Sequence, residues 1–172
     1  MALVGYSYGA RLATGALHLL GGGSMGKLEL VERAHADRPP LRVALVAAAV
    51  DAHWLRPEGY HGKAVSQCES LLLVNNQLDP AMRFYPLSPV GRRAAALGYV
   101  GVPGRSSLGE LAGRIHSMDM TKSVGRHHDL GDYLSASSVL GRELSQVVQM
   151  PATTADSAES SLAGREETES RQ

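Results

Sequence analysis

Several features that would narrow the function at once are missing from this sequence. Lys and Arg together number 17, as do Asp and Glu, so the formal net charge is zero. This balance does not indicate nucleic acid or an anionic membrane surface as a partner. The single cysteine, Cys68, excludes a disulfide within the chain. Only 5% of the residues are aromatic, so Ala, Leu, Val and Gly must fill most of the core.

Long apolar runs are missing as well. The longest, VALVAAAV at residues 43–50, has the length of a strand, whereas a membrane-spanning helix needs roughly 18 residues. The first residues lack the basic segment, apolar run and cleavage site of a secretory signal. We therefore expect no membrane span, and localisation stays open with the cytoplasm as the default.

What is present is an alternation of strand-like and helix-like segments. Apolar runs predict strands at residues 2–5, 41–50, 70–76 and 113–121. Helix formers predict helices at 8–20 and 129–149, the first with Leu12, Ala16 and Leu19 on one face and a stop at glycines 21–23. The segments between them are expected to hold a short helix within 24–40, a short helix and loop at 81–98, and a short strand or exposed loop at 99–104.

This order of elements predicts an α/β fold, with a mostly parallel sheet and helices on both of its faces. The alternation covers residues 1–150, which we take as one domain. From residue 151 the composition shifts to Ser, Thr, Glu and Ala. Residues 151–172 are therefore expected to form a disordered tail.

The stretch GYSYG has the pattern G-x-S-x-G, with Ser7 between Gly5 and Gly9. It falls where the first strand gives way to the first helix, which is where a nucleophilic serine is held on a sharp, strained turn. Small residues two positions before and after the serine are expected to prevent collisions across the turn. The backbone N–H of Tyr8 would then be free to stabilise an oxyanion. The alternative is a glycine-rich turn with an idle serine.

A serine nucleophile needs a base, and the base needs an orienting carboxylate. In enzymes with this strand–turn–helix serine, the acid follows the serine in the chain and the histidine comes last. Asp79 follows the strand at 70–76 and is our first candidate for the acid, although an Asp-Pro pair could also simply start a helix. Asp51, at the end of the strand at 41–50, is the second candidate.

Two of the seven histidines suit the position of the base. His127 and His128 lie in a loop after the last expected strand, and only one of them can point into the site. We favour His128 and keep His127 as the alternative. The other five lie before the acid or inside expected elements: His18, His35, His53, His61 and His116. His53 and His61 with Asp51 do not make a metal-ligand set, so no metal is assigned.

With these residues in place, residues 2–150 resemble the carboxyl-terminal part of an α/β-hydrolase. The resemblance is carried by LVGYSYGAR, AAAVDAHWL, LLLVNNQLDPAMRFYP and VGRHHDLGDYL. It implies a serine hydrolase of the carboxylesterase, lipase or thioesterase type, which transfers an acyl group from a small ester or thioester to water without a cofactor. Ser7 would attack the carbonyl, His128 would carry the proton and Asp79 would orient the histidine.

The chain departs from that family at its front, where only the strand ALVG precedes the turn that holds Ser7. The family's earlier strands, and the loop that donates a second oxyanion-hole N–H, have no counterpart in this sequence. The strand at 2–5 would then lie exposed along a sheet edge. The expectation is a fragment of a longer enzyme with a missing N-terminal half. A non-catalytic remnant, or half of a split protein that binds a ligand or partner without turnover, is the alternative.

Overall fold

The computed structural model describes residues 1–30, 41–89 and 93–136. The expected tail at 151–172 and most of the expected helix at 129–149 lie outside these residues, as does the segment at 31–40. The expectations for those segments stay predictions.

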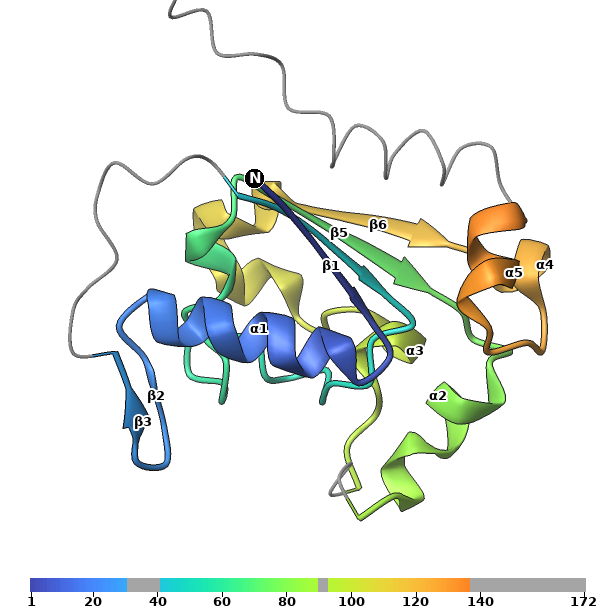
Figure 1. The fold of residues 1–172 in the computed structure, drawn as a ribbon, viewed down its shortest axis with the longest axis horizontal. Helices are drawn as coiled ribbons and strands as arrows, with labels where there is room; N and C mark the ends of the chain where they lie inside the picture. The colour runs from blue at the N-terminus through green and yellow to red at the C-terminus, as the bar shows by residue number, and fades with distance from the viewer. Residues whose placement is uncertain (31–40, 90–92, 137–172) are drawn as a thin grey trace, which may run out of the picture.

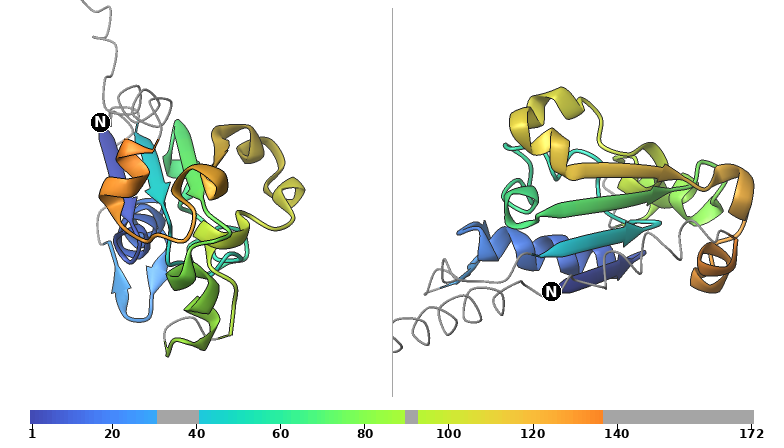
Figure 2. Two further views of the ribbon diagram at one scale, coloured as in Figure 1. Left: turned by 90° about the vertical axis from the view of Figure 1, so that its right-hand side faces the viewer. Right: turned by 90° about the horizontal axis from the view of Figure 1, so that it is seen from above.

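A four-stranded sheet forms the centre of the molecule, as Figures 1 and 2 show. Its strands are β1 (Ala2–Tyr6), β4 (Arg42–Val46), β5 (Ser70–Asn75) and β6 (Ile115–Asp119). They pair in the order β1-β4-β5-β6, and every pairing is parallel. The predicted α/β class with a mostly parallel sheet is therefore confirmed.

Alternation along the central strands divides the core into two layers. Val43, Leu45, Leu71 and Leu73 face the layer that includes α1 (Gly9–Leu20). Ala44, Val46, Leu72 and Val74 face the opposite layer. That layer includes side chains of α2 (Pro80–Phe84), α4 (Thr121–Val124) and α5 (Leu130–Ser135). Because side chains alternate along a strand, burial on both faces requires these nearly continuous apolar runs.

Helix α1 lies along one face of the sheet and ends as the glycines predict. Gly22 takes the left-handed conformation with φ of 74°, and the N–H of Gly21 bonds the carbonyl of Leu17. The buried side of α1 carries Ala10, Ala13, Thr14 and Leu17. The expected face of Leu12, Ala16 and Leu19 does not enter the core, and Leu12 is 78% exposed.

Two segments differ locally from what we expected, although part of the first, residues 31–40, lies outside the described residues. Residues 24–29 form a hairpin, with β2 (Ser24–Met25) antiparallel to β3 (Leu28–Glu29), instead of part of a helix. Gly26, with φ of 62°, supplies its turn. The segment expected as a strand or loop at 99–104 begins inside helix α3 (Leu97–Val100). Three 3₁₀ segments complete the described elements: η1 (Val65–Gln67), η2 (Tyr85–Leu87) and η3 (Arg105–Arg114).

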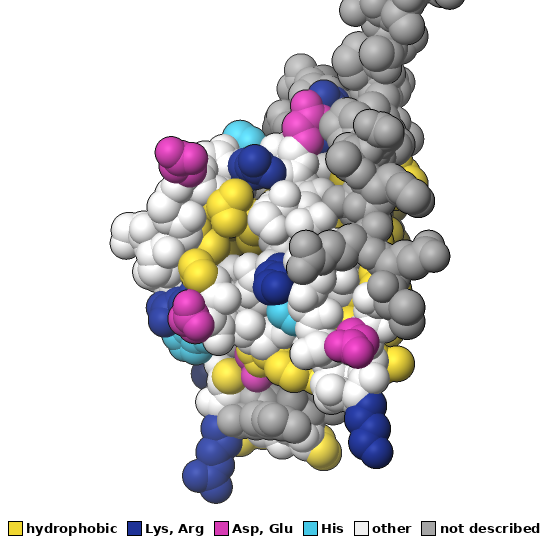
Figure 3. Space-filling view, turned by 90° about the vertical axis from the view of Figure 1, so that its left-hand side faces the viewer, with side chains coloured by type: hydrophobic (Ala, Val, Ile, Leu, Met, Phe, Trp, Pro, Cys, Tyr) yellow, Lys and Arg dark blue, Asp and Glu magenta, His cyan; other side chains and the backbone are white. Residues whose placement is uncertain are grey.

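Strand β1 lies at one edge of the sheet, and Val4 on it is 45% exposed. The expected edge position of this strand is thus confirmed. Figure 3 shows the face at the left-hand side of Figure 1, where Lys and Arg side chains are interspersed with Asp and Glu and with small apolar groups. None of the helices in the described part of the chain has the length and apolar character that crossing a membrane requires.

Candidate active site

Ser7 occupies the turn between β1 and α1 in a strained conformation. Its φ is 50°, a left-handed value that residues other than glycine rarely adopt. Three backbone hydrogen bonds hold it there: the Ser7 N–H donates to the carbonyl of Val46 at 3.0 Å, and the carbonyl of Ser7 accepts from the N–H groups of Ala49 and Ala10, each at 3.1 Å. Strain of this kind persists only where the surroundings impose it, and it concentrates at functional sites.

The two glycines of the motif have different roles. A Cβ on Gly5 would lie 2.7 Å from the Cα of Ala10, so only glycine lets the helix start against the strand. A Cβ at Gly9 would meet nothing within 4 Å. The expectation that both positions must be small is therefore right for Gly5 and wrong for Gly9.

Three side chains from separate elements form a continuous hydrogen-bonded chain. The Ser7 hydroxyl lies 3.1 Å from Nε2 of His128, and Nδ1 of His128 lies 2.6 Å from Oδ2 of Asp79. Ser7 follows β1, Asp79 follows β5, and His128 lies between α4 and α5, after β6. All three segments lie at the carboxyl ends of parallel strands, where ligands bind in open α/β sheets (Figure 1).

Asp79 is completely buried, and every hydrogen bond it makes favours its charged form. Its Oδ1 caps α2 by accepting from the N–H groups of Ala81 and Met82, and its Oδ2 accepts from His128 and from the Tyr133 hydroxyl. Burial acts to raise the pKa of Asp79, but these hydrogen bonds and the charge of His128 outweigh burial and lower the pKa below its ordinary value. Asp79 therefore combines the helix start expected of an Asp-Pro pair with a contact to His128.

Two tyrosines that our sequence reasoning did not select hold this chain in place. The buried Tyr133 donates its hydroxyl to Oδ2 of Asp79 at 2.9 Å. Tyr6 donates to the backbone carbonyl of His128 at 2.8 Å, and its ring stacks on the imidazole at 5.4 Å between centroids. For Tyr6, the usable signal was the alternation of side chains along the strand. Leu3 and Tyr6 lie on opposite faces of β1, and Tyr6 faces the core layer that also contains Tyr133.

A pocket of about 340 Å³ opens beside the Ser7 hydroxyl. Its lining consists of Ser7, Tyr8, Ala49, Ala81, Met82, Phe84, Tyr85, Ser88 and His128. Among the described residues, no acceptor bonds the Tyr8 N–H, whereas the N–H groups of Ser7 and Ala10 are engaged. The Tyr8 N–H is thus available at the turn, as expected for an oxyanion donor.

The alternative residues are placed elsewhere. Asp51 accepts a 2.6 Å hydrogen bond from the hydroxyl of Tyr85, and both side chains are buried. Burial and the neighbouring Asp51 raise the pKa of Tyr85, so Tyr85 keeps the proton that it donates. The His127 side chain, 67% exposed, pairs with Asp132 at 2.9 Å. Neither Asp51 nor His127 joins the Ser7–His128–Asp79 chain.

The remaining histidines also lie apart from Ser7. His18 and His61 are buried near each other, with ring centroids 6.0 Å apart, and His116 lies on β6. His35 is outside the described residues. Within the described ranges, no three His, Cys, Asp or Glu side chains gather as a metal site.

Comparisons with known proteins add no relative. A scan against protein-family models, a search of curated proteins and a search of solved structures each return no match. Any assignment of function therefore depends on the chemistry of the site.

Proposed function

We propose that this protein is a serine hydrolase related to the α/β-hydrolases, and that it transfers acyl groups from small esters or thioesters to water. The observation that carries this proposal is the unbroken hydrogen-bonded chain from the Ser7 hydroxyl through His128 to the buried Asp79. Serine on a strained strand–helix turn, with acid and histidine following in that order, is the arrangement of this reaction class.

In the proposed reaction, Ser7 Oγ attacks the substrate carbonyl while Nε2 of His128 takes the hydroxyl proton. Asp79 accepts from Nδ1–H, which keeps Nε2 unprotonated in the resting state and stabilises the imidazolium that forms. The Tyr8 N–H donates to the developing oxyanion. His128 then returns the proton to the leaving alcohol or thiol, which leaves an acyl ester on Ser7. A water molecule, deprotonated by His128, hydrolyses that ester and restores the serine.

The pocket beside Ser7 indicates a neutral acyl group. Its nine lining residues include no Asp, Glu, Lys or Arg, and several are apolar. Its volume of about 340 Å³ lies near the lower end of the range for small-molecule sites. Short and medium uncharged acyl chains therefore fit the proposal better than acidic or basic ones. No step requires a cofactor.

Turnover of p-nitrophenyl esters tests the proposed function. We expect the full chain to hydrolyse the acetate and butyrate esters, and Ser7→Ala to abolish this turnover. Ser88→Ala is the matched control, because Ser88 lines the same pocket but donates its hydroxyl to the carbonyl of Tyr85 at 2.7 Å. Turnover that persists in Ser7→Ala, or that disappears only in Ser88→Ala, would contradict the assignment.

A further inference from the structure

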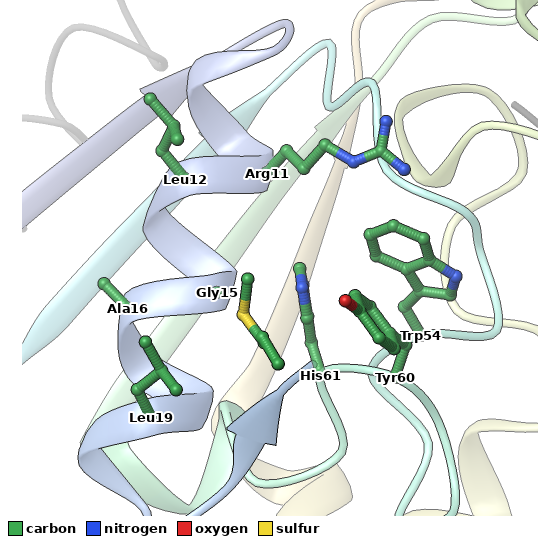
Figure 4. Close-up of a pocket in the computed structure, with 9 residues that line it drawn as sticks. Arg11, Leu12, Gly15, Ala16, Leu19, Trp54, Tyr60 and His61 are labelled. Atoms are coloured by element: carbon green, nitrogen blue, oxygen red, sulfur yellow. The ribbon is translucent and has the colours of Figure 1, made fainter. Parts of the chain in front are cut away.

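A second pocket shares no lining residue with the pocket at Ser7. It has a volume of about 630 Å³ and lies between α1 and the loop that follows β4 (Figure 4). Five residues of α1 line one side, and Trp54, Tyr60 and His61 line the other, with Met25 of β2 beside them. An inference about this pocket does not depend on the proposed hydrolase activity.

His61 is held in this pocket wall by a hydrogen bond between its ring and Thr14. The hydroxyl of Thr14 has one proton, which it donates to the carbonyl of Ala10 at 2.9 Å. The same hydroxyl lies 2.8 Å from Nδ1 of His61, and while it donates to Ala10 it can accept from the ring only when the imidazole proton is on Nδ1. Burial, with the nearby charges of His18 and Arg11, lowers the pKa of His61 to about 4, so the ring is neutral at pH 7.

The other ring nitrogen of His61 lacks a partner. His61 is 0% exposed, and among the described residues nothing donates to its Nε2. A Cβ at Gly15 would lie 3.6 Å from Nε2 and 3.1 Å from Sδ of Met25. A side chain at Gly15 would therefore press on the flexible Met25 thioether, which cannot donate a hydrogen bond, and would contact Nε2. A buried acceptor without a donor is costly, which favours a ligand that supplies one.

The walls of the pocket determine what else the ligand must be. Trp54 packs against Tyr60 and His61 with ring centroids 4.8 and 4.6 Å apart, and the guanidinium of Arg11 lies 4.3 Å from the Trp54 ring. Figure 4 shows His61 between Gly15 of the helix and the ring of Tyr60, with Arg11 extending toward Trp54. Aromatic walls opposite the mostly apolar side chains of α1 suit a flat, apolar molecule. No lining residue is acidic, so a cationic ligand would have no counter-charge there.

We propose that this pocket binds a small, uncharged, flat ring compound that donates one hydrogen bond, from N–H or O–H, to Nε2 of His61. The Met25 side chain moves aside to admit the donor. Indole is the probe with the required chemistry, and benzofuran is its control, since it has nearly the same shape but no donor.

Nuclear magnetic resonance on the full chain tests this site. Imidazole nitrogen spectra should show His61 protonated on Nδ1, and indole should shift the Nε2 resonance together with the backbone signals of Gly15 and Tyr60. We expect indole to bind about tenfold more tightly than benzofuran, because one additional hydrogen bond changes the dissociation constant by roughly that factor. A proton on Nε2, equal affinities for the two compounds, or no shift at these residues would overturn the proposal.

Substitutions on and near α1 locate the ligand independently. Gly15→Ala places a methyl group near Nε2 and should weaken indole binding by at least about tenfold while favouring the helix. Gly9→Ala adds the same methyl to the same helix where nothing lies within 4 Å, and should leave indole affinity within about twofold. His61→Phe should remove the preference for indole over benzofuran. Unchanged indole affinity in Gly15→Ala would contradict the site.

Discussion

His128 and His61 lie in the walls of two pockets and are held in different ways. His128 has a hydroxyl on Nε2 and a buried carboxylate on Nδ1, and its side chain is 26% exposed. His61 has a hydroxyl on Nδ1, no donor to Nε2 among the described residues, and no exposure. The carboxylate is the decisive difference, because it stabilises the imidazolium that a general base becomes.

The presence or absence of this carboxylate suits the two histidines to different roles. A histidine with Asp79 behind it can take a proton from Ser7 and hold the charge that results. A buried histidine with a pKa of about 4 resists protonation at neutral pH and serves best as a hydrogen-bond acceptor. Substitutions that remove either histidine or its partners should therefore affect different measurements.

The largest effect is expected from His128→Ala. Without the base, the Ser7 hydroxyl keeps its proton, and we expect ester turnover to fall by roughly 10⁴- to 10⁶-fold. Steady-state hydrolysis of p-nitrophenyl acetate measures this. The control is His127→Ala, which removes only an exposed hydrogen bond with Asp132 and should change turnover by less than about twofold. Equal losses in the two variants would contradict the assignment of His128 as the base.

Asp79→Asn should have the next largest effect. Asn can still cap α2, but its amide can donate to Nδ1 of His128 and favour the wrong tautomer, so we expect turnover to fall by roughly 10³- to 10⁴-fold. Asp51→Asn is the control, since it retains an oxygen that can accept from Tyr85. A larger loss in Asp51→Asn than in Asp79→Asn would transfer the role of the acid to Asp51.

Tyr133→Phe should have a smaller effect. Burial and the neighbouring Asp79 raise the pKa of Tyr133, which therefore stays protonated and donates to the same Oδ2 that holds His128. Loss of this donor should raise the pKa of Asp79 and reduce turnover about tenfold. The pH dependence of turnover distinguishes this effect from general destabilisation: the profile of Tyr133→Phe should shift, whereas that of Asp51→Asn should keep the shape of the wild-type profile.

The smallest effects concern stability against pH. The pKa of His61 is lowered from 6.5 to about 4, so the unfolded chain binds more protons in that interval. The free energy of unfolding should therefore decrease as the pH falls from about 6.5 to about 4, and His61→Phe should lack this decrease. The lowered pKa of Asp79 adds a second loss below pH 3.8, which Asp79→Asn should remove. Denaturant titrations across this pH range measure both losses of stability. If the wild type, His61→Phe and Asp79→Asn showed the same dependence of unfolding free energy on pH, the lowered pKa values of His61 and Asp79 would be contradicted.

Local pattern was enough to predict much of the fold. The apolar runs of β4 and β5 and the glycine stop after α1 correspond to the observed elements. The hairpin of β2 and β3 was not predictable from periodicity, because each strand has two residues and its turn depends on the left-handed Gly26. The buried face of α1 was misjudged because the small Ala10 and Ala13 lie on it beside Leu17, whereas Leu12 is exposed.

The candidate site likewise contains residues that local sequence pattern predicts and residues that it does not. Ser7, Asp79 and His128 could be selected because each follows a recognisable strand. They also occur along the chain in the expected order of serine, acid and histidine. Tyr133 meets Asp79 across 54 residues and Tyr6 meets His128 across 122, and no local pattern encodes such pairs. The strain at Ser7 likewise depends on Val46 and Ala49, which belong to a neighbouring strand and its following loop.

Covalent labelling of the full chain with a fluorophosphonate, followed by peptide mapping by mass spectrometry, tests the central claim most directly. We expect one adduct, located on Ser7, with its rate of formation strongly reduced in His128→Ala and unchanged in His127→Ala. An unlabelled chain, an adduct on another residue, or labelling that survives Ser7→Ala would contradict the account.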